Sequence, residues 1–225
     1  MEGRLSLVST PIGNLQDLTL RAIQTFSDAD VVACEDTRVT GVLLKAHGIA
    51  SKSFLSIHHH TQDRALYELI EKIKNGLKVA YASDAGTPGV NDPGGRLVEL
   101  AYEAGVAIEV IPGASALTAA ISACGFPMEH FSYIGFIPMK HHRQATFKAI
   151  ADRTEATVFF ESTHRITKTL AELSAHLSSD RLIYVGRELT KKFETHLRGP
   201  IATVISQLEK GSTKGEFTVI VGPVR

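Results

Sequence analysis

The sequence predicts an α/β protein of two small domains, with a mostly parallel five-stranded sheet in the first and a mixed sheet in the second. Short runs rich in β-branched residues alternate with longer segments of helical period, which is typical of βαβ units. The chain has 225 residues, 44% of them hydrophobic, enough for two buried cores. Less helix is expected between the strands of the last third, so a mixed sheet is expected there.

Ten short segments are expected to be strands, because they are apolar, rich in β-branched residues and bounded by turn formers. The first five are Leu5–Ser9, Asp30–Cys34, Phe54–His58, Val79–Ser83 and Ile108–Ile111. The other five are Phe131–Phe136, Thr157–Phe160, Leu182–Gly186, Lys192–Leu197 and Phe217–Val221. The first five complete one α/β unit, and the helical pattern that follows them is interrupted at residues 124–127. The expected domains are therefore residues 1–115 and 116–225.

Three helices of the first domain have recognisable ends. The first is expected to be capped by Asp17, and the second spans residues 63–75. The third is expected to begin at Asp92 with Pro93 at its first position, and to run to Ala104.

Composition and charge exclude several classes of protein. There are 24 Lys and Arg against 24 Asp and Glu, and 2 Cys, which excludes disordered, collagen-like and disulfide-scaffold chains. The paucity of cysteine favours a reducing compartment. The first residues carry no apolar run of signal-peptide length, and residues 106–124 are too interrupted to span a bilayer. A cytoplasmic protein without membrane contact is expected.

Three loops that follow predicted strands are candidates to hold a ligand, because open α/β sheets bind ligands beyond the carboxyl ends of their strands. Residues 9–14 form the first loop, which matches neither GxGxxG nor GxxxxGK[ST]. Residues 83–95 form a long loop with four glycines, in which Asp84 could accept hydrogen bonds from ribose hydroxyls or an amino group. Residues 111–116 are small and leave room for a flat ligand. Each loop is also compatible with an ordinary turn.

Charged side chains gather at the ends of three predicted strands of the second domain, where a cleft between the domains would open. These clusters are residues 161–165, 187–194 and 214–216. Solvated surface ion pairs are the alternative interpretation of any one of them.

Three consecutive histidines, His58, His59 and His60, raise the question of a metal site. Neighbouring residues of a strand point to opposite faces, so the three rings cannot converge on one ion. No HExxH or cysteine-rich spacing accompanies them. A structural or substrate-side role is favoured, and no metal site is expected.

Seven segments, in order along the chain, together resemble the ribosomal RNA small subunit methyltransferase I family, a tetrapyrrole-methylase-like group of S-adenosylmethionine (SAM) enzymes. They are residues 8–19, 34–38, 83–89, 112–116, 161–165, 186–191 and 214–216. The resemblance implies two α/β domains of the tetrapyrrole-methylase type, with SAM held between them, and usually a homodimer. It also implies 2′-O-methylation of a cytidine ribose in the decoding region of 16S ribosomal RNA, with the RNA or the small ribosomal subunit as partner. One departure is Thr61-Gln62, where the family often has Asn-Glu.

Carried over by position, the resemblance implies which residues contact the cofactor. These are Pro11, Asp84, Gly86, Thr87, Ser115 and Ala116, with Phe160, Glu188 and Glu216 from the second domain. Transfer to a hydroxyl is assisted by a general base, for which the candidates include Glu161, Glu188, Lys191 and Glu216. A lysine base would need a lowered pKa, and the sequence alone does not choose among the candidates. Phosphates near the target would be bound by Arg38, Arg165, Arg187 and Lys192.

The zero net charge conceals an asymmetry that bears on an RNA partner. Residues 1–139 hold 10 basic and 15 acidic residues, and residues 140–225 hold 14 and 9. The second half is therefore basic, as an RNA-facing domain would be. The alternatives are a methyltransferase of the same fold that acts on a corrinoid precursor or on a modified histidine of a translation factor, and a SAM-binding module without catalysis. A dinucleotide-dependent dehydrogenase is disfavoured by the missing GxGxxG.

Overall fold

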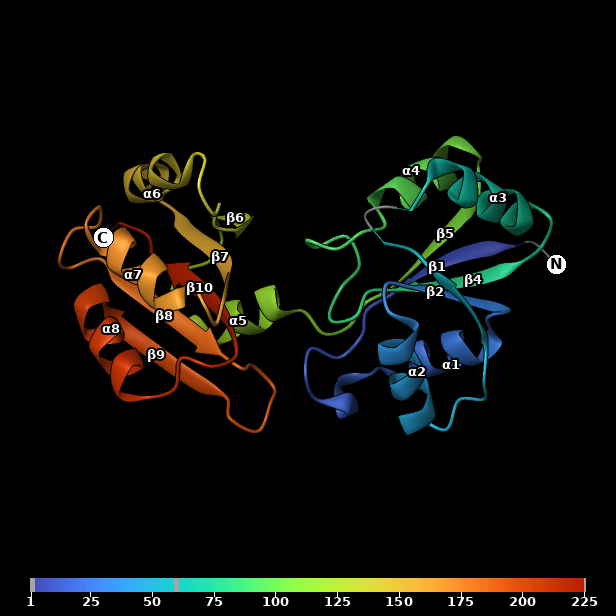
Figure 1. The fold of residues 1–225 in the computed structure, drawn as a ribbon, viewed down its shortest axis with the longest axis horizontal. Coiled ribbons are helices and arrows are strands. Elements are labelled where there is room, and N and C mark those ends of the chain that lie inside the picture. Colours follow the sequence, from blue (N-terminus) through green and yellow to red (C-terminus); the bar gives the residue numbers. More distant parts are fainter. Residues whose placement is uncertain (1–2, 59–60, 225) are drawn as a thin grey trace. The chain divides into compact units, whose positions relative to one another are not determined.

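The computed structural model describes residues 3–58 and 61–224, and the chain separates into two compact units, Met1–Ser115 and Ala116–Arg225 (Figure 1). The first unit holds 10 basic and 14 acidic residues, and the second holds 14 and 10. The units therefore carry opposite net charges of −4 and +4.

The first unit is built on a parallel sheet with the strand order β3-β2-β4-β1-β5. Its strands are β1 (Arg4–Val8), β2 (Val31–Cys34), β3 (Ser53–Ser56), β4 (Lys78–Ala82) and β5 (Ala107–Ile111). The central pairings are in register, with Leu7 opposite both Tyr81 and Val110. All neighbouring strands run parallel, so their carboxyl ends share one edge.

Helices cover both faces of this sheet. They are α1 (Leu20–Asp28), α2 (Thr37–Ala46), α3 (Asp63–Lys74) and α4 (Gly95–Glu103), with a short 3₁₀ turn at Leu15–Asp17. One core cluster joins α3 and α4 to the sheet, and a second joins α1 and α2 to it (Figure 1). Strands covered on both faces are apolar throughout, which explains their short apolar runs in the sequence.

Two predicted helix starts in the first unit are wrong. The helix predicted to be capped by Asp17 has Thr19 as its N-cap, whose hydroxyl accepts from the Ala22 N–H. The helix predicted to begin at Asp92 starts at Gly95, after Gly94. Gly94 has φ 121°, and a Cβ there would lie 2.4 Å from the Tyr81 ring, so the chain is held in a loop up to this glycine.

The second unit is built on a mixed sheet with the order β6-β7-β10-β8-β9. Its strands are β6 (Phe131–Phe136), β7 (Ala156–Ser162), β8 (Leu182–Arg187), β9 (Thr195–Pro200) and β10 (Glu216–Val221). Only β6 and β7 pair in parallel among the described strands of this unit; the other pairings are antiparallel. The predicted fold class, with a parallel and a mixed sheet, is confirmed.

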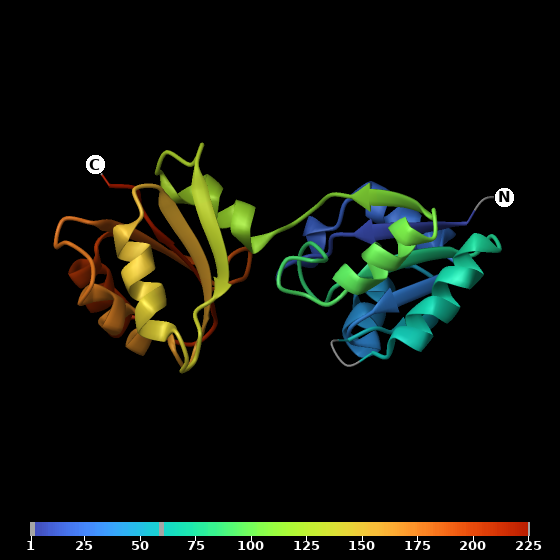
Figure 2. The same ribbon diagram turned by 90° about the horizontal axis from the view of Figure 1, so that it is seen from above.

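Helix is sparser in the last third of the chain, as predicted, and none of the described helices lies between β8 and β9, but the second unit also contains helices. They are α5 (Ala116–Cys124), α6 (Arg143–Asp152), α7 (Ile166–Ser174) and α8 (Ile201–Lys210). Helices α6, α7 and α8 share one core cluster with the sheet, and α5 packs against β8 and β10 (Figure 2). The antiparallel pairing arises from the β8–β9 hairpin and from the insertion of β10 between β7 and β8.

Three smaller expectations can be compared with the structure. The predicted strand ending at His58 ends at Ser56, and His59 and His60 lie outside the described residues. Both cysteines, Cys34 and Cys124, are buried free thiols. Within residues 3–58 and 61–224, no helix is long and apolar enough to cross a membrane.

Candidate functional site

The loops after β1 and β4 of the first unit are bonded to each other at the carboxyl edge of the sheet. The backbones of Thr10 and Gly86 exchange two hydrogen bonds, at 2.9 and 3.1 Å. The Thr10 hydroxyl also donates to the Ser83 carbonyl at 3.1 Å. Pro11, a predicted cofactor residue, is buried directly after this contact. The first two candidate loops therefore form one structure.

Hydroxyl groups extend this structure to the loop after β5. The Ser9 and Thr87 hydroxyls lie 3.0 Å apart, and the Thr87 hydroxyl donates to the Ala114 carbonyl at 3.2 Å. A Cβ on Gly113 would lie 3.0 Å from the Ser9 Cβ, so the chains approach closely here. All three candidate loops meet because β4, β1 and β5 are neighbours in the sheet.

Gly86 lies where a side chain would fill the space between these loops. Its φ is +86°, and an added Cβ would lie 3.3 Å from Ile12 Cγ2 and 3.8 Å from the Ala114 carbonyl oxygen. Left-handed backbone of this kind favours glycine. We call this meeting point of the three loops, formed by Thr10, Gly86, Thr87 and Ala114, the cradle.

The exposed carboxylate of Asp84 lies next to this cradle and is joined to the end of β2. Its Oδ1 accepts from the Asp36 N–H at 2.9 Å, and the Asp84 N–H lies 3.4 Å from Glu35 Oε1. The sequence analysis did not place Glu35 and Asp36 at the site. The signal that could have found them is the position of β2, which ends at the same edge as β4.

Arg38 is predicted to bind RNA, and the structure places it on the surface near the same edge. Its guanidinium forms an ion pair with Asp36 at 2.6 Å, and the Arg38 side chain is 89% exposed. The hydrogen bonds from Arg38 lower the pKa of Asp36 to about 2, so this carboxylate is ionised at neutral pH. The Asp84–Asp36 edge is therefore acidic with one exposed cation.

Ser115 and Ala116 are also predicted to contact the cofactor, and they fall on either side of the division between the two units. Ser115 closes the first unit, and Ala116 begins α5 of the second. Both are half-buried.

A second group of predicted residues meets in the second unit, where β8 ends and β10 begins. Lys191 Nζ lies 3.0 Å from Glu188 Oε1 and 2.8 Å from Glu216 Oε2. Glu188 Oε1 also accepts from the Glu216 N–H at 2.9 Å. Glu188 and Thr190 have φ of 52° and 67°, conformations that cost non-glycine residues roughly 1–3 kcal/mol each. The surrounding contacts therefore hold the backbone of this loop in an unfavourable conformation.

The proton affinities in this group count against two of the candidate bases. Burial lowers the pKa of Lys191, but its contacts with Glu216 and Glu188 outweigh burial and raise the pKa above its usual value. A lysine base would need the opposite shift, so the direction of this shift counts against Lys191 as the base. Burial raises the pKa of Glu188, yet hydrogen bonds from the Glu216 backbone and Lys191 leave it below its usual value. Glu188 is therefore a weaker base than an ordinary glutamate.

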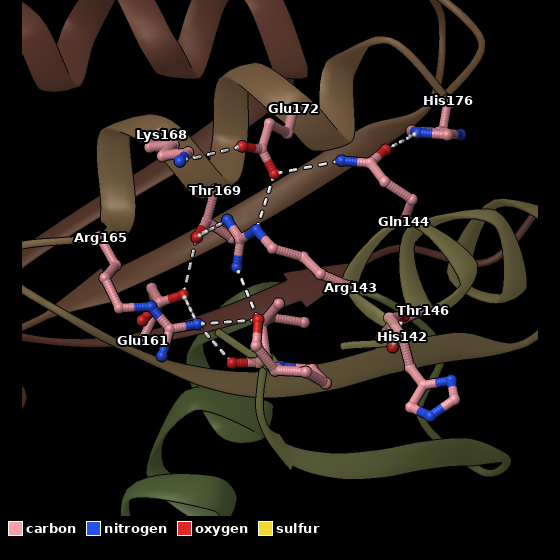
Figure 3. Close-up of polar contacts among 12 residues, drawn as sticks. His142, Arg143, Gln144, Thr146, Glu161, Arg165, Lys168, Thr169, Glu172 and His176 are labelled. Atoms are coloured by element: carbon pink, nitrogen blue, oxygen red, sulfur yellow. Dashed lines mark hydrogen bonds and ion pairs between the residues drawn. The ribbon is translucent and has the colours of Figure 1, made fainter. Parts of the chain in front are cut away.

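Glu161, another candidate base, is buried inside a separate network (Figure 3). It is 1% exposed, and its Oε2 accepts from the Thr169 hydroxyl at 2.7 Å and lies 3.3 Å from Arg165 Nη2. Arg143 donates to Thr169 at 2.8 Å and to Glu172 at 2.7 Å. These contacts join β7, α6 and α7. The network buries Glu161 and occupies its Oε2, and this burial counts against a role as the base.

The remaining residues predicted to contact RNA differ in their surroundings. Arg165 donates to the Ile137 carbonyl, and Arg187 donates to the Lys214 and Phe193 carbonyls at 2.6 and 2.9 Å. These two guanidinium groups use some of their N–H donors to hold backbone carbonyls of the second unit. Lys192 is exposed. Phe160, predicted to face the cofactor, is half-buried and makes edge contacts with Tyr133 and Phe136, whose ring centroids lie 5.3 and 5.7 Å away.

Comparison with known proteins identifies the chain's relatives. Residues 4–205 match the family of Tetrapyrrole (Corrin/Porphyrin) Methylases. The protein of Haemophilus influenzae named ribosomal RNA small subunit methyltransferase I is 42% identical over 224 residues, which cover 98% of this chain and 79% of the relative. The protein of that name from Thermotoga maritima is 39% identical over 219 residues, which cover 97% of this chain and 98% of the relative.

Solved structures of similar fold have lower identities. A diphthine synthase has a TM-score of 0.74 at 16% identity and covers 97% of this chain and 89% of its own. Cobalt precorrin-4 methyltransferase gives 0.71 at 17%, covering 97% and 94%. Uroporphyrin-III C-methyl transferase from Thermus thermophilus, complexed with S-adenyl homocysteine, gives 0.64 at 20%, covering 98% and 97%. At these identities the likeness concerns the fold alone.

Proposed function

The chain belongs to the tetrapyrrole methylase family, and within it to the ribosomal RNA small subunit methyltransferase I group, and on that premise we propose a specific reaction. The protein is a SAM-dependent methyltransferase. It transfers the methyl group to the 2′-hydroxyl of a cytidine ribose in the decoding region of 16S ribosomal RNA. It acts in the cytoplasm as a homodimer.

The observation that carries this proposal is the cradle at the carboxyl edge of the first unit, formed by Thr10, Gly86, Thr87 and Ala114. The cradle fits SAM because glycine and small residues admit a flat group, and the nearby Asp84 carboxylate can accept hydrogen bonds from hydroxyls or an amine. SAM carries positive charge on its sulfur and its amino group. The acidic edge and the net charge of −4 on this unit are complementary to it.

The reaction depends mainly on the placement of SAM and the ribose hydroxyl relative to each other. When bound, SAM would supply a methyl group on a cationic sulfur for transfer to a ribose oxygen, with breakage of the S–CH3 bond and S-adenosylhomocysteine as the leaving group. The loops joined by Ser9, Thr87 and Gly86 hold their ligand in one orientation, because hydrogen bonds at 2.9–3.2 Å link all three. Correct placement of two reactants can contribute on the order of 7–11 kcal/mol. The raised pKa of Lys191 and the lowered pKa of Glu188 both disfavour removal of the hydroxyl proton by these groups, which favours positioning as the larger contribution.

The test of the reaction is methyl transfer to defined RNA substrates. The purified protein is incubated with radiolabelled SAM and small ribosomal subunits, or their precursor RNA, from a strain that lacks the enzyme. Digestion to nucleosides should yield labelled 2′-O-methylcytidine. No label in any RNA form would refute the proposal, and label in a base-methylated nucleoside would refute the assignment to ribose.

The test of the cofactor site is the variant Asp84→Ala. We expect SAM to bind at least tenfold more weakly, about 1.4 kcal/mol, because the carboxylate acceptor is lost. The matched control is Asp84→Asn, which keeps an oxygen for the Asp36 N–H and should fold like the wild type. Titration calorimetry with SAM measures both. An unchanged affinity in folded Asp84→Ala would remove Asp84 from the site.

A further inference from the structure

The turn between β8 and β9, residues 188–194, presents an exposed aromatic ring next to basic side chains. Phe193 is 66% exposed, and Lys192 Nζ lies 5.5 Å from the centroid of its ring. Single exposed apolar side chains are common on protein surfaces, so exposure alone indicates nothing. The hydrogen bonds that hold the turn on both sides of this ring are a more specific observation.

Arg187 fixes the backbone of the turn directly behind the ring. Its Nη1 donates to the Phe193 carbonyl at 2.9 Å, and its Nε donates to the Lys214 carbonyl at 2.6 Å. One guanidinium thus holds Phe193 and Lys214 next to each other. The ammonium groups of Lys192 and Lys214 both lie on exposed residues. The Lys192 ammonium therefore lies beside the ring, and the backbone of the exposed Lys214 is held close to that of Phe193.

A chain of hydrogen bonds ties the other side of the turn to the interior of the sheet. The Thr190 N–H donates to Glu194 Oε2 at 2.5 Å, and Glu194 Oε1 lies 2.7 Å from His196 Nε2. His196 Nδ1 lies 2.6 Å from the hydroxyl of Tyr184, which is 1% exposed. Glu194 thus connects the strained Thr190 to a buried tyrosine, and the turn is held in one conformation.

We propose that Phe193 stacks on an unpaired base of the RNA substrate, while Lys192 and Lys214 contact the neighbouring phosphates. This inference rests on the proposed function, which supplies RNA as the partner. Single-stranded RNA is bound by exposed aromatic rings between basic side chains, because every base has a face on which a ring can stack. A ring on a rigid turn loses little conformational freedom on binding. The strained Glu188 and Thr190 are then the conformational cost of presenting it.

Charge favours RNA over a second copy of the chain as the occupant of this surface. The cores of protein interfaces are depleted in lysine, whereas Lys192 lies beside this ring and the exposed Lys214 is on the neighbouring segment. The second unit carries a net charge of +4, which complements a phosphate backbone.

The experiment measures binding of an unstructured cytidine-containing oligoribonucleotide by fluorescence anisotropy. We expect Phe193→Ala to weaken binding about tenfold, within the range that stacking on one aromatic side chain contributes. Phe193→Trp should bind within about twofold of the wild type. The matched control is Tyr102→Ala, which removes an aromatic ring that is 73% exposed on α4 of the first unit and should change nothing. SAM affinity should be equal in all four proteins.

A salt series tests the lysines separately. Lys192→Ala should flatten the dependence of log affinity on log salt by about 0.7, the value for one phosphate of a single strand. Lys148→Ala, an exposed lysine on α6, is the control and should leave the slope unchanged.

Three results would overturn the inference. The first is that Phe193→Ala binds the oligoribonucleotide with wild-type affinity, and the second is that the wild type does not bind it. The third is that Phe193→Ala has a lower oligomeric state with unchanged RNA binding, which would assign the ring to a contact between copies. Methyl transfer by the wild type to small subunits is scored separately. Labelled subunits with unaffected Phe193→Ala would leave the proposed function standing and remove only this inference.

Discussion

The two units differ in how the polar groups at the ends of their strands are bonded. In the first unit the loops are joined through hydroxyls, backbone groups and a glycine in left-handed conformation, and the Asp84 carboxylate stays exposed. In the second unit the charged groups mainly bond to one another and to the backbone, as Glu161 and Arg187 do. Charge at a strand end therefore does not by itself indicate chemistry. In the second unit most of it holds loops in place.

The largest effect is expected from breaking the buried network of the second unit. Glu161→Ala removes a buried carboxylate, leaving the Thr169 hydroxyl without its acceptor and Arg165 without its ion-pair partner, so the free energy of unfolding should fall by about 3–5 kcal/mol. Chemical denaturation measures the loss. Glu209→Ala, an exposed glutamate on α8, is the control and should stay within about 0.5 kcal/mol of the wild type. A stable Glu161→Ala protein would show that the network does not hold the unit together.

An intermediate effect is expected in the first unit, on ligand affinity and not mainly on stability. Gly86→Ala places a Cβ in the cradle, 3.3 Å from Ile12, and should weaken SAM binding about tenfold, or roughly 1.4 kcal/mol. Gly89→Ala is a close control, because φ at Gly89 is +85° but an added Cβ meets nothing within 4 Å. Both should be destabilised by about 1 kcal/mol through backbone strain. Equal SAM affinities for the two variants would contradict the cradle.

Lys191→Met is expected to change the free energy of unfolding only slightly, which is the smallest effect predicted. The pKa of Lys191 is raised above about 10.5 and that of Glu188 is lowered below about 4.5. Their interaction therefore stabilises the fold between these values, and is lost as pH rises through the Lys191 pKa or falls through the Glu188 pKa. Because the group is partly solvated, the difference in stability should not exceed about 1 kcal/mol near pH 7. Urea denaturation across pH measures it.

Lys191→Arg provides the second half of that test, now on activity. Arginine keeps the positive charge but cannot lose a proton near neutral pH. We expect the pH profile of methyl transfer to keep its shape in this variant. A profile that loses an ionisation would restore Lys191 as a base.

The sequence predicted the positions of most strands well, because apolar runs are local signals, but the strand predicted at Lys192–Leu197 lies at Thr195–Pro200. It did not predict the position of the first turn of α4, since only the approach of the Tyr81 ring to Gly94 explains why the loop continues. It also did not distinguish Glu161 from Glu216. One is 1% exposed and the other has a side chain that is 81% exposed, a difference that depends on tertiary packing.

The most direct test of the account is a comparison of two variants with two ligands. Dissociation constants for SAM and for the oligoribonucleotide are measured for Gly86→Ala and Phe193→Ala against the wild type. The account predicts that Gly86→Ala binds SAM about tenfold more weakly and RNA normally, and that Phe193→Ala does the reverse. If either variant weakened both ligands equally, the assignment of SAM to the first unit and RNA to the second would be contradicted.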